Sequence, residues 1–279
     1  MALFDAIKEN YPKLSKGKKL LADFIVGSFE QAAFMTAAAL GQRVGVSEST
    51  VVRFATDLGL EGYPQLQKQL REMLKSRLTT VQRADMAVGM ARSDALRSVL
   101  SGDMLDLRET LENVDFDAFD KAVEAILNAR KIYVLGLRSA MPLAQFLSYY
   151  LDFVCDNVMF INGAVQNIRE RMVRLNEQDL LIGISFPRYD TKTIGAMNEA
   201  KSRGATVLAF TDRKDGPAGV IADIVLQAKT NMVSFADSIA APLSLINALL
   251  VAVGLSRREE AKKHMQQLEN VWREEDTYL

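Results

Sequence analysis

The chain has 279 residues, of which 49 % are hydrophobic and 25 % are charged, a composition that excludes intrinsic disorder and leaves room for two ordinary domains. A single cysteine, Cys155, excludes an internal disulfide framework, and with a single histidine, His264, a zinc cluster is not expected. The net charge of −1 is unevenly distributed, because residues 1–77 carry +3 and residues 78–279 carry −4. We therefore expect a small basic module and a larger acidic one, with neither metal nor cofactor.

Apolar runs in this sequence are short. None reaches the roughly 18 uninterrupted apolar residues of a membrane span. Residues 1–11 form an amphipathic pattern instead of the apolar stretch of a secretion signal. We expect a cytoplasmic protein that does not act on a membrane.

The first 77 residues favour five short helices and no strand. Apolar residues from Leu3 to Tyr11 have helical spacing, and Pro12 ends this first helix. Each later helix begins near a residue that favours helix initiation. These residues are Ser15 for the second helix, Thr36 for helix 37–44, Ser47 for the helix that reaches Leu58, and Pro64 for the helix that reaches Leu74.

The third and fourth of these helices fit a helix-turn-helix. Gly45-Val46-Ser47 suits the tight turn between them. At 100° per residue, the apolar side chains at 51, 54, 55 and 58 share one face of the fourth helix, and Ser49, Arg53 and Thr56 lie opposite. The N-terminal part of such a helix meets base edges in the major groove of DNA. The alternative is a plain helical hairpin in a small domain.

This pattern predicts contacts with double-stranded DNA. Arg53 could bind a guanine through two hydrogen bonds, while Ser49 and Thr50 could contact bases or phosphates. The amide groups at the helix start, beside Ser47, suit a phosphate. Other basic side chains would contact the DNA backbone and set affinity, not sequence choice. They are Lys16, Lys18, Lys19, Lys68 and Arg71.

Residues 78–112 are interpreted as a linker and a connecting helix. Small and polar residues dominate residues 76–93, which are expected to be a partly helical hinge. Apolar residues then return at helical spacing, which favours a bridging or dimer-contact helix. This stripe consists of Leu96, Val99, Leu100, Met104, Leu107 and Leu111.

Residues 113–279 predict an α/β domain. Five short apolar runs alternate with helical stretches or turns, which is typical of a parallel sheet covered on both faces. The runs are 132–135, 158–161, 180–184, 207–210 and 224–226. We expect a three-layer sandwich with a ligand cleft at the carboxyl ends of the strands, where the strand order reverses. An apolar helix near 239–253 and a charged helix from 257 to about 275 close the chain.

The N-terminal motifs resemble those of RpiR/MurR-type transcriptional regulators. The sequence V-S-E-S-T-V-V-R-F at 46–54 and L-G-L-E-G-Y at 58–63 match the family pattern. The remainder resembles the family's sugar isomerase (SIS) domain. The resemblance implies a DNA-binding domain at 1–77 and an effector-binding SIS domain at 113–279. It further implies a regulator of carbohydrate genes, expected to be a repressor, that binds operator DNA as a homodimer or homotetramer.

The effector cleft departs from that family pattern. SIS domains place G-x-G-x-S after strand 1 and S-x-S-G, followed by threonines, after strand 3. Here Arg138 replaces the second glycine and Ser139 stands one position early. After strand 3, Ser185 and Thr193 match, whereas Pro187, Arg188 and Asp190 differ. Half of the phosphate-binding pattern is therefore present, and two arginines join it.

Arginine side chains in a cleft favour anionic partners. We expect an acidic sugar or sugar-phosphate effector bound by Arg138, Ser139, Ser185, Arg188, Tyr189, Asp190 and Thr193. A structural Arg–Asp ion pair that closes a degenerate cleft is the alternative. Polar residues after strands 2 and 4 are weaker candidates by position: Gln166, Asn167, Thr211 and Asp212.

The competing function is a sugar-phosphate isomerase or lyase. That chemistry needs a positioned base, commonly glutamate or histidine. His264 is expected on the surface of the charged C-terminal helix. Glu170 and Glu199 follow strands 2 and 3, but nothing in the sequence pairs either with a second acid–base group. The sequence favours a regulator that is not an enzyme.

Overall fold

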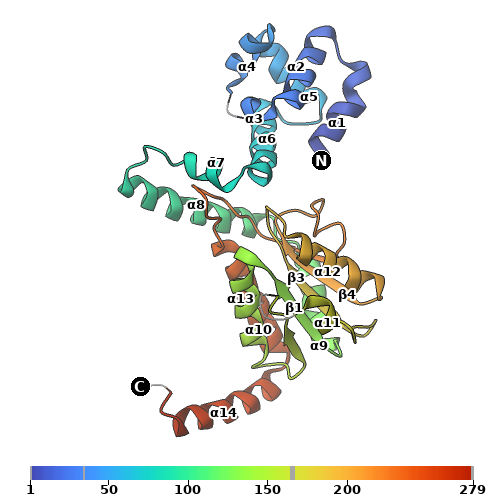
Figure 1. Cartoon of the computed structure of the whole chain (residues 1–279), viewed down its shortest axis with the longest axis vertical. Coiled ribbons are helices and arrows are strands. Elements are labelled where there is room, and N and C mark those ends of the chain that lie inside the picture. The colour runs from blue at the N-terminus through green and yellow to red at the C-terminus, as the bar shows by residue number, and fades with distance from the viewer. Residues whose placement is uncertain (1, 34, 164–166, 278–279) are drawn as a thin grey trace. The chain divides into compact units, whose positions relative to one another are not determined.

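The computed structural model describes residues 2–33, 35–163 and 167–277, and it divides into two compact units, residues 1–79 and 80–279 (Figure 1). The first unit is helical. Its elements are α1 (Ala2–Asn10), the 3-10 turn η1 (Tyr11–Lys13), α2 (Lys16–Gly27), α3 (Phe29–Ala32), α4 (Ala37–Val44), α5 (Glu48–Asp57) and α6 (Tyr63–Arg77).

Local capping explains where α4 and α5 begin. The Thr36 hydroxyl accepts a hydrogen bond from the amide of Ala39 at 3.1 Å, and the Ser47 hydroxyl accepts one from the amide of Thr50 at 3.3 Å. Each satisfies a backbone donor that has no partner within its helix. The capping residues therefore confirm the predicted starts of both helices.

The core of the first unit is formed by one apolar face from each helix. Its fully buried members include Leu21, Ile25, Leu40, Phe54 and Leu66. Two elements were not expected from the sequence. The first helix ends at Asn10, before Pro12, and Pro12 is the second residue of the 3-10 turn η1, where its missing amide hydrogen costs nothing. The four-residue α3 is too short to leave a periodic signal.

The second unit begins with α7 (Thr80–Asp85), α8 (Arg92–Glu112) and α9 (Phe116–Asn128). An α/β region follows, and its elements are β1 (Ile132–Gly136), the 3-10 turn η2 (Arg138–Ala140), α10 (Met141–Leu151), β2 (Val158–Phe160), α11 (Ile168–Arg171), β3 (Leu180–Ile184), α12 (Thr191–Ser202), β4 (Thr206–Thr211), β5 (Ile224–Gln227), α13 (Ala240–Ser256) and α14 (Arg258–Glu274).

The five strands form one parallel sheet in the order β2-β1-β3-β4-β5. Alternate residues of each strand face opposite layers. Ile132 and Val134 of β1 pack into a cluster with α9, α10 and α13, whereas Tyr133 and Leu135 pack into a second cluster with α12 (Figure 1). The predicted three-layer sandwich is confirmed, with both faces of the sheet covered.

This strand order fixes where a cleft forms. β1 and β3 are neighbours, but the chain leaves β1 toward β2 on one side and leaves β3 toward β4 on the other. The following loops separate at this point, which is where open α/β sheets bind their ligands, and we call the place between the carboxyl ends of β1 and β3 the crevice. The residues after Gly136 and Ile184 therefore meet at one site.

The connecting helix α8, interpreted from the sequence as a bridging or dimer-contact helix, leaves its apolar stripe largely exposed. Leu96, Leu100, Met104 and Leu111 are between 55 % and 72 % exposed, while Asp106 on the same helix is fully buried. The Asp106 carboxylate accepts hydrogen bonds from the backbone and side-chain amides of Asn231. α8 therefore docks through a polar group and leaves most of its apolar stripe uncovered in the single chain.

Among the described residues, no single helix is long and apolar enough to cross a membrane. Helices α13 and α14 satisfy such a test only as a pair, and they are bent by 104° relative to each other.

Candidate functional site

The turn between α4 and α5 is built around two glycines. Gly45 ends α4 in the left-handed conformation, at φ 81°, which favours glycine. Gly41 is the second, because a Cβ there would lie 2.7 Å from the carbonyl oxygen of Val46. The amide of Val46 donates to the carbonyl of Gly41 at 2.8 Å and closes the turn. Sequence reasoning missed Gly41, whose signal is a small residue four positions before the turn glycine.

Helix α5 has the two faces that the sequence predicts. Val51, Phe54 and Ala55 are fully buried, whereas Ser49 and Arg53 are exposed. The Arg53 guanidinium lies back along the helix, with Nε donating to the Ser49 carbonyl at 3.2 Å and Nη2 to its hydroxyl at 3.3 Å. An exposed positive group is therefore held at the first turn of α5.

Hydroxyl groups surround the same turn. The Ser47 hydroxyl lies 2.9 Å from that of Ser49 and 2.8 Å from that of Thr50. The four residues expected to read DNA thus form one hydrogen-bonded group at the N-terminus of α5. Hydroxyls, a guanidinium and helix-terminal amides are the donors that protein–DNA interfaces use.

The lysines expected to contact the DNA backbone differ in exposure and in their contacts. Lys16 and Lys68 are exposed, and the Lys19 ammonium lies 5.4 Å from the centre of the Tyr11 ring. Lys18 pairs with Asp57 and so ties α2 to the end of α5. The side chain of Arg71 lies outside the described residues.

The crevice between β1 and β3 contains an ion pair. Arg138 Nε donates to Asp190 Oδ2 at 3.1 Å, and the Arg138 side chain is 82 % exposed. Asp190 Oδ1 accepts from the amides of Lys192 and Thr193 at 3.0 and 3.1 Å, which caps α12. The carboxylate therefore occupies the helix N-terminus, a position that favours an anion.

The backbone at Arg138 explains why glycine is the family residue there. Its φ is 54°, in the left-handed region where a side chain costs roughly 1–2 kcal/mol. Arg138 is thus held in a strained conformation at the mouth of the crevice. An outlier of this kind at a strand end is typical of a functional position.

Ser185 is a buried polar residue at the carboxyl end of β3. It follows β3 directly and is 3 % exposed, and among the described residues its hydroxyl has no hydrogen-bond partner. A buried hydroxyl without a partner costs about 1–3 kcal/mol. Thr193, which is 1 % exposed, lies on α12 next to the amides that Asp190 caps. A bound ligand that offers an oxygen would satisfy the Ser185 hydroxyl.

Tyr189 anchors the loop after β3 to the end of β4. Its hydroxyl donates to Asp212 Oδ1 at 2.6 Å, and the Thr211 hydroxyl contacts the same oxygen at 3.3 Å. Burial raises the pKa of the Asp212 carboxyl, although the hydrogen bond from Tyr189 opposes this. Burial is also the main cause that raises the pKa of the Tyr189 hydroxyl. Tyr189 therefore positions the loop after β3 through its hydrogen bond to Asp212, which directly follows β4.

Two further residues expected to bind the effector, Arg188 and Ser139, are both exposed. Arg188 is exposed, and its Nη1 donates to Thr80 Oγ1 on α7 at 3.2 Å. Ser139 is exposed within the turn η2. Asn167 caps α11 by accepting from the amide of Arg169 at 3.0 Å, and Gln166 lies outside the described residues. The structure thus joins Arg138, Asp190 and Thr193 by hydrogen bonds, places Ser185 at the end of the adjacent strand β3, and directs Arg188 to the connecting segment.

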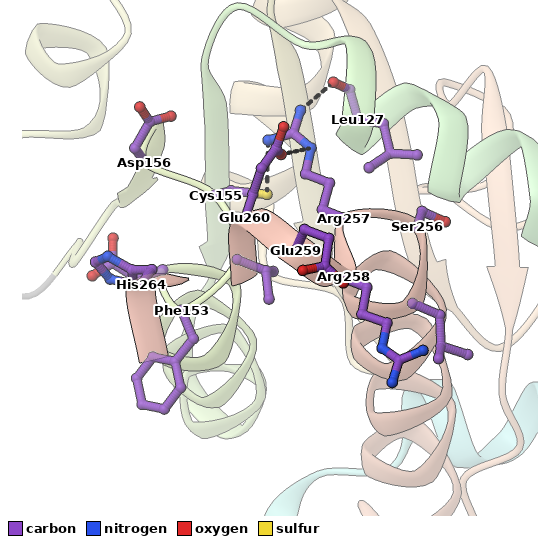
Figure 2. Close-up of a pocket in the computed structure, with 13 residues that line it drawn as sticks. Leu127, Phe153, Cys155, Asp156, Ser256, Arg257, Arg258, Glu259, Glu260 and His264 are labelled. Carbon is purple, nitrogen blue, oxygen red and sulfur yellow. Dashed lines mark hydrogen bonds and ion pairs between the residues drawn. The ribbon is translucent and has the colours of Figure 1, made fainter. Parts of the chain in front are cut away.

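A separate pocket lies at the opposite, amino edge of the sheet, where α9, α10 and α14 meet (Figure 2). Arg257 lines it, donating to the Leu127 carbonyl at 2.5 Å and lying 3.9 Å from Cys155 Sγ and 4.0 Å from Glu260. Burial raises the pKa of the Cys155 thiol, so the reactive thiolate is disfavoured. Arg257 thereby stabilises the bend between α13 and α14.

The three side chains weighed as acid–base groups are either paired with arginines or exposed. Glu199 is engaged by Arg169 at 3.2 Å and by Arg203 at 2.7 Å. Glu170 is exposed, and His264 lies exposed on α14. No group of three or more His, Cys, Asp or Glu side chains that could hold a metal occurs among the described residues.

Known proteins resemble both parts of this chain. Residues 1–77 match the model of the rpiR-family helix-turn-helix domain, and residues 125–252 match that of the SIS domain. The HTH-type transcriptional regulator HexR of Pseudomonas aeruginosa is 26 % identical over 271 residues, which covers 95 % of this chain and 94 % of that protein.

Solved structures show the same fold. The sugar isomerase domain of an RpiR transcription factor from Sphaerobacter thermophilus gives a TM-score of 0.60 with 28 % identity, covering 62 % of this chain and 97 % of that one. The Vibrio vulnificus NanR protein, complexed with ManNAc-6P, gives a TM-score of 0.60 with 22 % identity and covers 97 % of both chains. The arrangement of a helical reading unit before a sugar-isomerase sandwich is therefore shared.

Proposed function

We propose, from the premise that this chain is an RpiR-type transcriptional regulator with a SIS domain, that α5 reads operator DNA and that the β1/β3 crevice binds an acidic effector. Residues 1–77 would form the DNA-binding domain, 78–112 the linker and connecting helix, and 113–279 the effector domain. The protein would act in the cytoplasm, where its operator lies, as a repressor of carbohydrate genes.

The observation that carries the DNA-reading role is the exposed first turn of α5. Ser47, Ser49, Thr50 and Arg53 present hydroxyl and guanidinium donors from a helix whose opposite face is fully buried. A helix held this rigidly can enter a major groove with its N-terminal side chains at base edges. Arg53 would bind guanine, and Lys16, Lys19 and Lys68 would contact phosphates.

Selection of duplexes from a random pool with the full chain tests this role. We expect an enriched sequence with two half-sites whose centres lie roughly 34–36 Å apart or a multiple of that spacing. Its affinity should exceed that of scrambled duplex by a factor of roughly 10³ or more at fixed salt. A pool that never enriches above the scrambled duplex would contradict DNA reading.

The effector class follows from the charges and donors in the crevice. Arg138 favours an anionic ligand group, and the buried Ser185 hydroxyl lies where an acceptor oxygen would satisfy it. Asp190 already occupies the α12 N-terminus, so the ligand's anion would approach Arg138 and Arg188 or displace that carboxylate. The relative from V. vulnificus was solved with a sugar phosphate, which supports a ligand of this class.

Thermal stabilisation by a defined panel tests the effector class. The acidic probes are N-acetylmannosamine 6-phosphate, glucose 6-phosphate and gluconate, and the neutral probes are N-acetylmannosamine and glucose. We expect at least one acidic probe to raise the melting temperature and its neutral counterpart not to do so. Ser185→Ala should lose most of that shift. Equal stabilisation by neutral sugars would exclude an anion-selective crevice.

Two arguments support self-association of the chain: the small DNA footprint of one helix-turn-helix and an exposed apolar surface on α8. One helix-turn-helix contacts few base pairs, so specific binding needs at least a dimer. The uncovered apolar stripe of α8, with Leu96, Leu100 and Leu111, offers a surface that a second copy of the chain would bury. A homodimer or homotetramer would then present paired reading helices.

Catalysis is the second possibility, because the SIS fold also serves isomerases. The engagement of Glu199 by two arginines speaks against it, since a general base must be able to reach substrate. Incubation with aldose and ketose phosphates should give no isomerisation above the uncatalysed rate. Turnover that Glu199→Gln abolishes would instead establish an enzyme.

A further inference from the structure

Helix α7 is the first element of the larger unit, and it rests on two loops at the carboxyl edge of the sheet. Its first residue, Thr80, accepts a hydrogen bond from Arg188 Nη1 at 3.2 Å. Its fourth residue, Arg83, donates from Nη1 to both carboxylate oxygens of Asp237, at 2.9 and 3.1 Å. The segment that leads from residues 1–79 is therefore attached to the loop after β3 and to the loop after β5.

The loop after β5, residues 228–239, is held by contacts of its own, apart from its contact with α7. The amide of Lys229 donates to Thr110 Oγ1 at 3.0 Å, and the amide of Asn231 donates to Asp106 Oδ2 at 2.7 Å, so α8 holds its first part. A bridge between Met232 and Asp237 closes the loop on itself. The loop that carries Asp237 is therefore held by α8 and by its own bridge, independently of the contact with Arg83.

The two attachments of α7 differ in strength. Arg83 is 4 % exposed and its bond to Asp237 joins two charges, so breaking it would leave a charge buried. The bond from Arg188 to Thr80 lies between exposed groups, and its acceptor is a neutral hydroxyl. An anion competes well for a guanidinium against such an acceptor. The Arg83–Asp237 attachment is therefore the stable one, and the Arg188–Thr80 attachment can be replaced by a contact with an anion.

We propose that α7 is a latch whose docking is controlled by the loop that carries Arg188. This inference rests on the proposed effector crevice, because Arg188 belongs to the same β3 loop as Ser185 and Asp190. An anion bound there draws the Arg188 guanidinium away from Thr80, and the first turn of α7 loosens. The state of the crevice thereby reaches the segment that joins the two units, provided that the anion binds the two arrangements with different affinity.

Amide hydrogen exchange of the full chain tests the latch without DNA or effector. Thr80→Val removes the acceptor, and Arg188→Ala removes the donor from the crevice side. Each should speed exchange of the amides of Ala84 and Asp85, which follow the first turn of α7, by roughly 2- to 10-fold, the range expected for one hydrogen bond. The double variant should exchange no faster than either single variant, because both remove the same contact.

Matched variants separate the latch from general loosening. Thr80→Ser keeps a hydroxyl and should exchange like the wild type. Arg169→Ala removes an exposed arginine contact elsewhere, the ion pair with Glu199 between α11 and α12, and should leave exchange in α7 unchanged. Asp237→Asn should speed exchange more than Thr80→Val, because it weakens the buried pair; if that variant does not fold, the Thr80 series decides alone.

Three results would overturn the latch. They are unchanged exchange in Thr80→Val, additive effects in the double variant, and an equal effect of Arg169→Ala. None of these results depends on operator or effector, so failure of the latch is distinguishable from failure of the proposed function, which the duplex selection and the sugar panel test.

Discussion

Arg53 is the side chain on which sequence choice by α5 depends most. It is the only basic residue of α5, and its position beside Ser49 keeps it at the first turn. We expect Arg53→Ala to weaken binding to the selected duplex by about 1–3 kcal/mol and to relax the preference at one base pair. Titrations at fixed salt against selected and scrambled duplexes measure this. Equal losses on both would identify Arg53 as a phosphate contact.

Gly41 fixes the turn that orients α5. Because a Cβ there would lie 2.7 Å from the Val46 carbonyl, Gly41→Ala should lower the free energy of unfolding by about 1–3 kcal/mol. Gly27→Ala is the control, since a Cβ at that helical position meets nothing within 4 Å and alanine favours the helix. Denaturant melts of both variants should move in opposite directions. A neutral Gly41→Ala would show that the turn can shift at little cost.

Asp212 gives stability a pH dependence of unusual sign. Its pKa is raised in the fold above the ordinary 3.8, mainly by burial, so the folded state holds this proton more tightly than the unfolded state. The protonated Asp212 carboxyl therefore contributes its full stabilisation below about pH 3.8. This contribution to the free energy of unfolding is lost as the pH rises through the raised pKa of Asp212 in the folded state. Asp212→Asn keeps an acceptor for Tyr189 without the ionisation.

The comparison of Asp212→Asn with the wild type isolates this effect. From pH 4 upward, the wild-type free energy of unfolding should fall relative to that of the variant. Urea melts across this range measure the difference. A difference in the free energy of unfolding that is constant with pH, or that grows in favour of the wild type, would show that ionisation of Asp212 does not destabilise the folded state.

At the scale of elements, the sequence was most informative where local chemistry decides. Thr36 and Ser47 cap α4 and α5 where expected, because a capping hydroxyl acts within three residues. The five apolar runs became the five strands, since a strand buried on both faces needs continuous apolar residues. The strand order made β1 and β3 neighbours, and the Arg138–Asp190 ion pair joins the loops that follow them.

Contacts between distant segments were not visible in the sequence. Nothing local indicates that Arg83 pairs with Asp237, 154 positions away, or that Arg188 extends to Thr80, 108 positions away. Asp106 interrupts the apolar pattern of α8, yet it is the residue that α8 buries, because Asn231 satisfies it. Apolar periodicity does not identify a helix that docks through a carboxylate.

The exposed stripe of α8 makes a prediction at this scale. Leu100 and Leu111 are 55 % and 72 % exposed, so Leu100→Glu/Leu111→Glu should leave the single chain folded but place charges in the interface between copies. We expect sedimentation to show a shift toward monomer. Val173→Glu, at another exposed apolar position, is the control. Unchanged association in the α8 variant would place the interface elsewhere.

At the scale of the whole molecule, two units with different tasks share one connecting segment. In the proposed function the first unit presents α5 to DNA, and the second binds an anion near the buried Ser185 hydroxyl and the strained Arg138. Effector control requires that the ligand bind the DNA-competent and DNA-incompetent arrangements with different affinity. The latch at α7 is a physical connection through which that difference could act.

Operator affinity as a function of effector concentration tests the central claim most directly. Anisotropy of the labelled, selected duplex would be followed while N-acetylmannosamine 6-phosphate, glucose 6-phosphate or gluconate is added to the full chain. The account predicts that at least one of these acids weakens duplex binding by roughly 5- to 150-fold, that its neutral counterpart does not, and that Ser185→Ala blunts the response. Duplex affinity that none of the three acids changes, or a response that Ser185→Ala leaves intact, would contradict it.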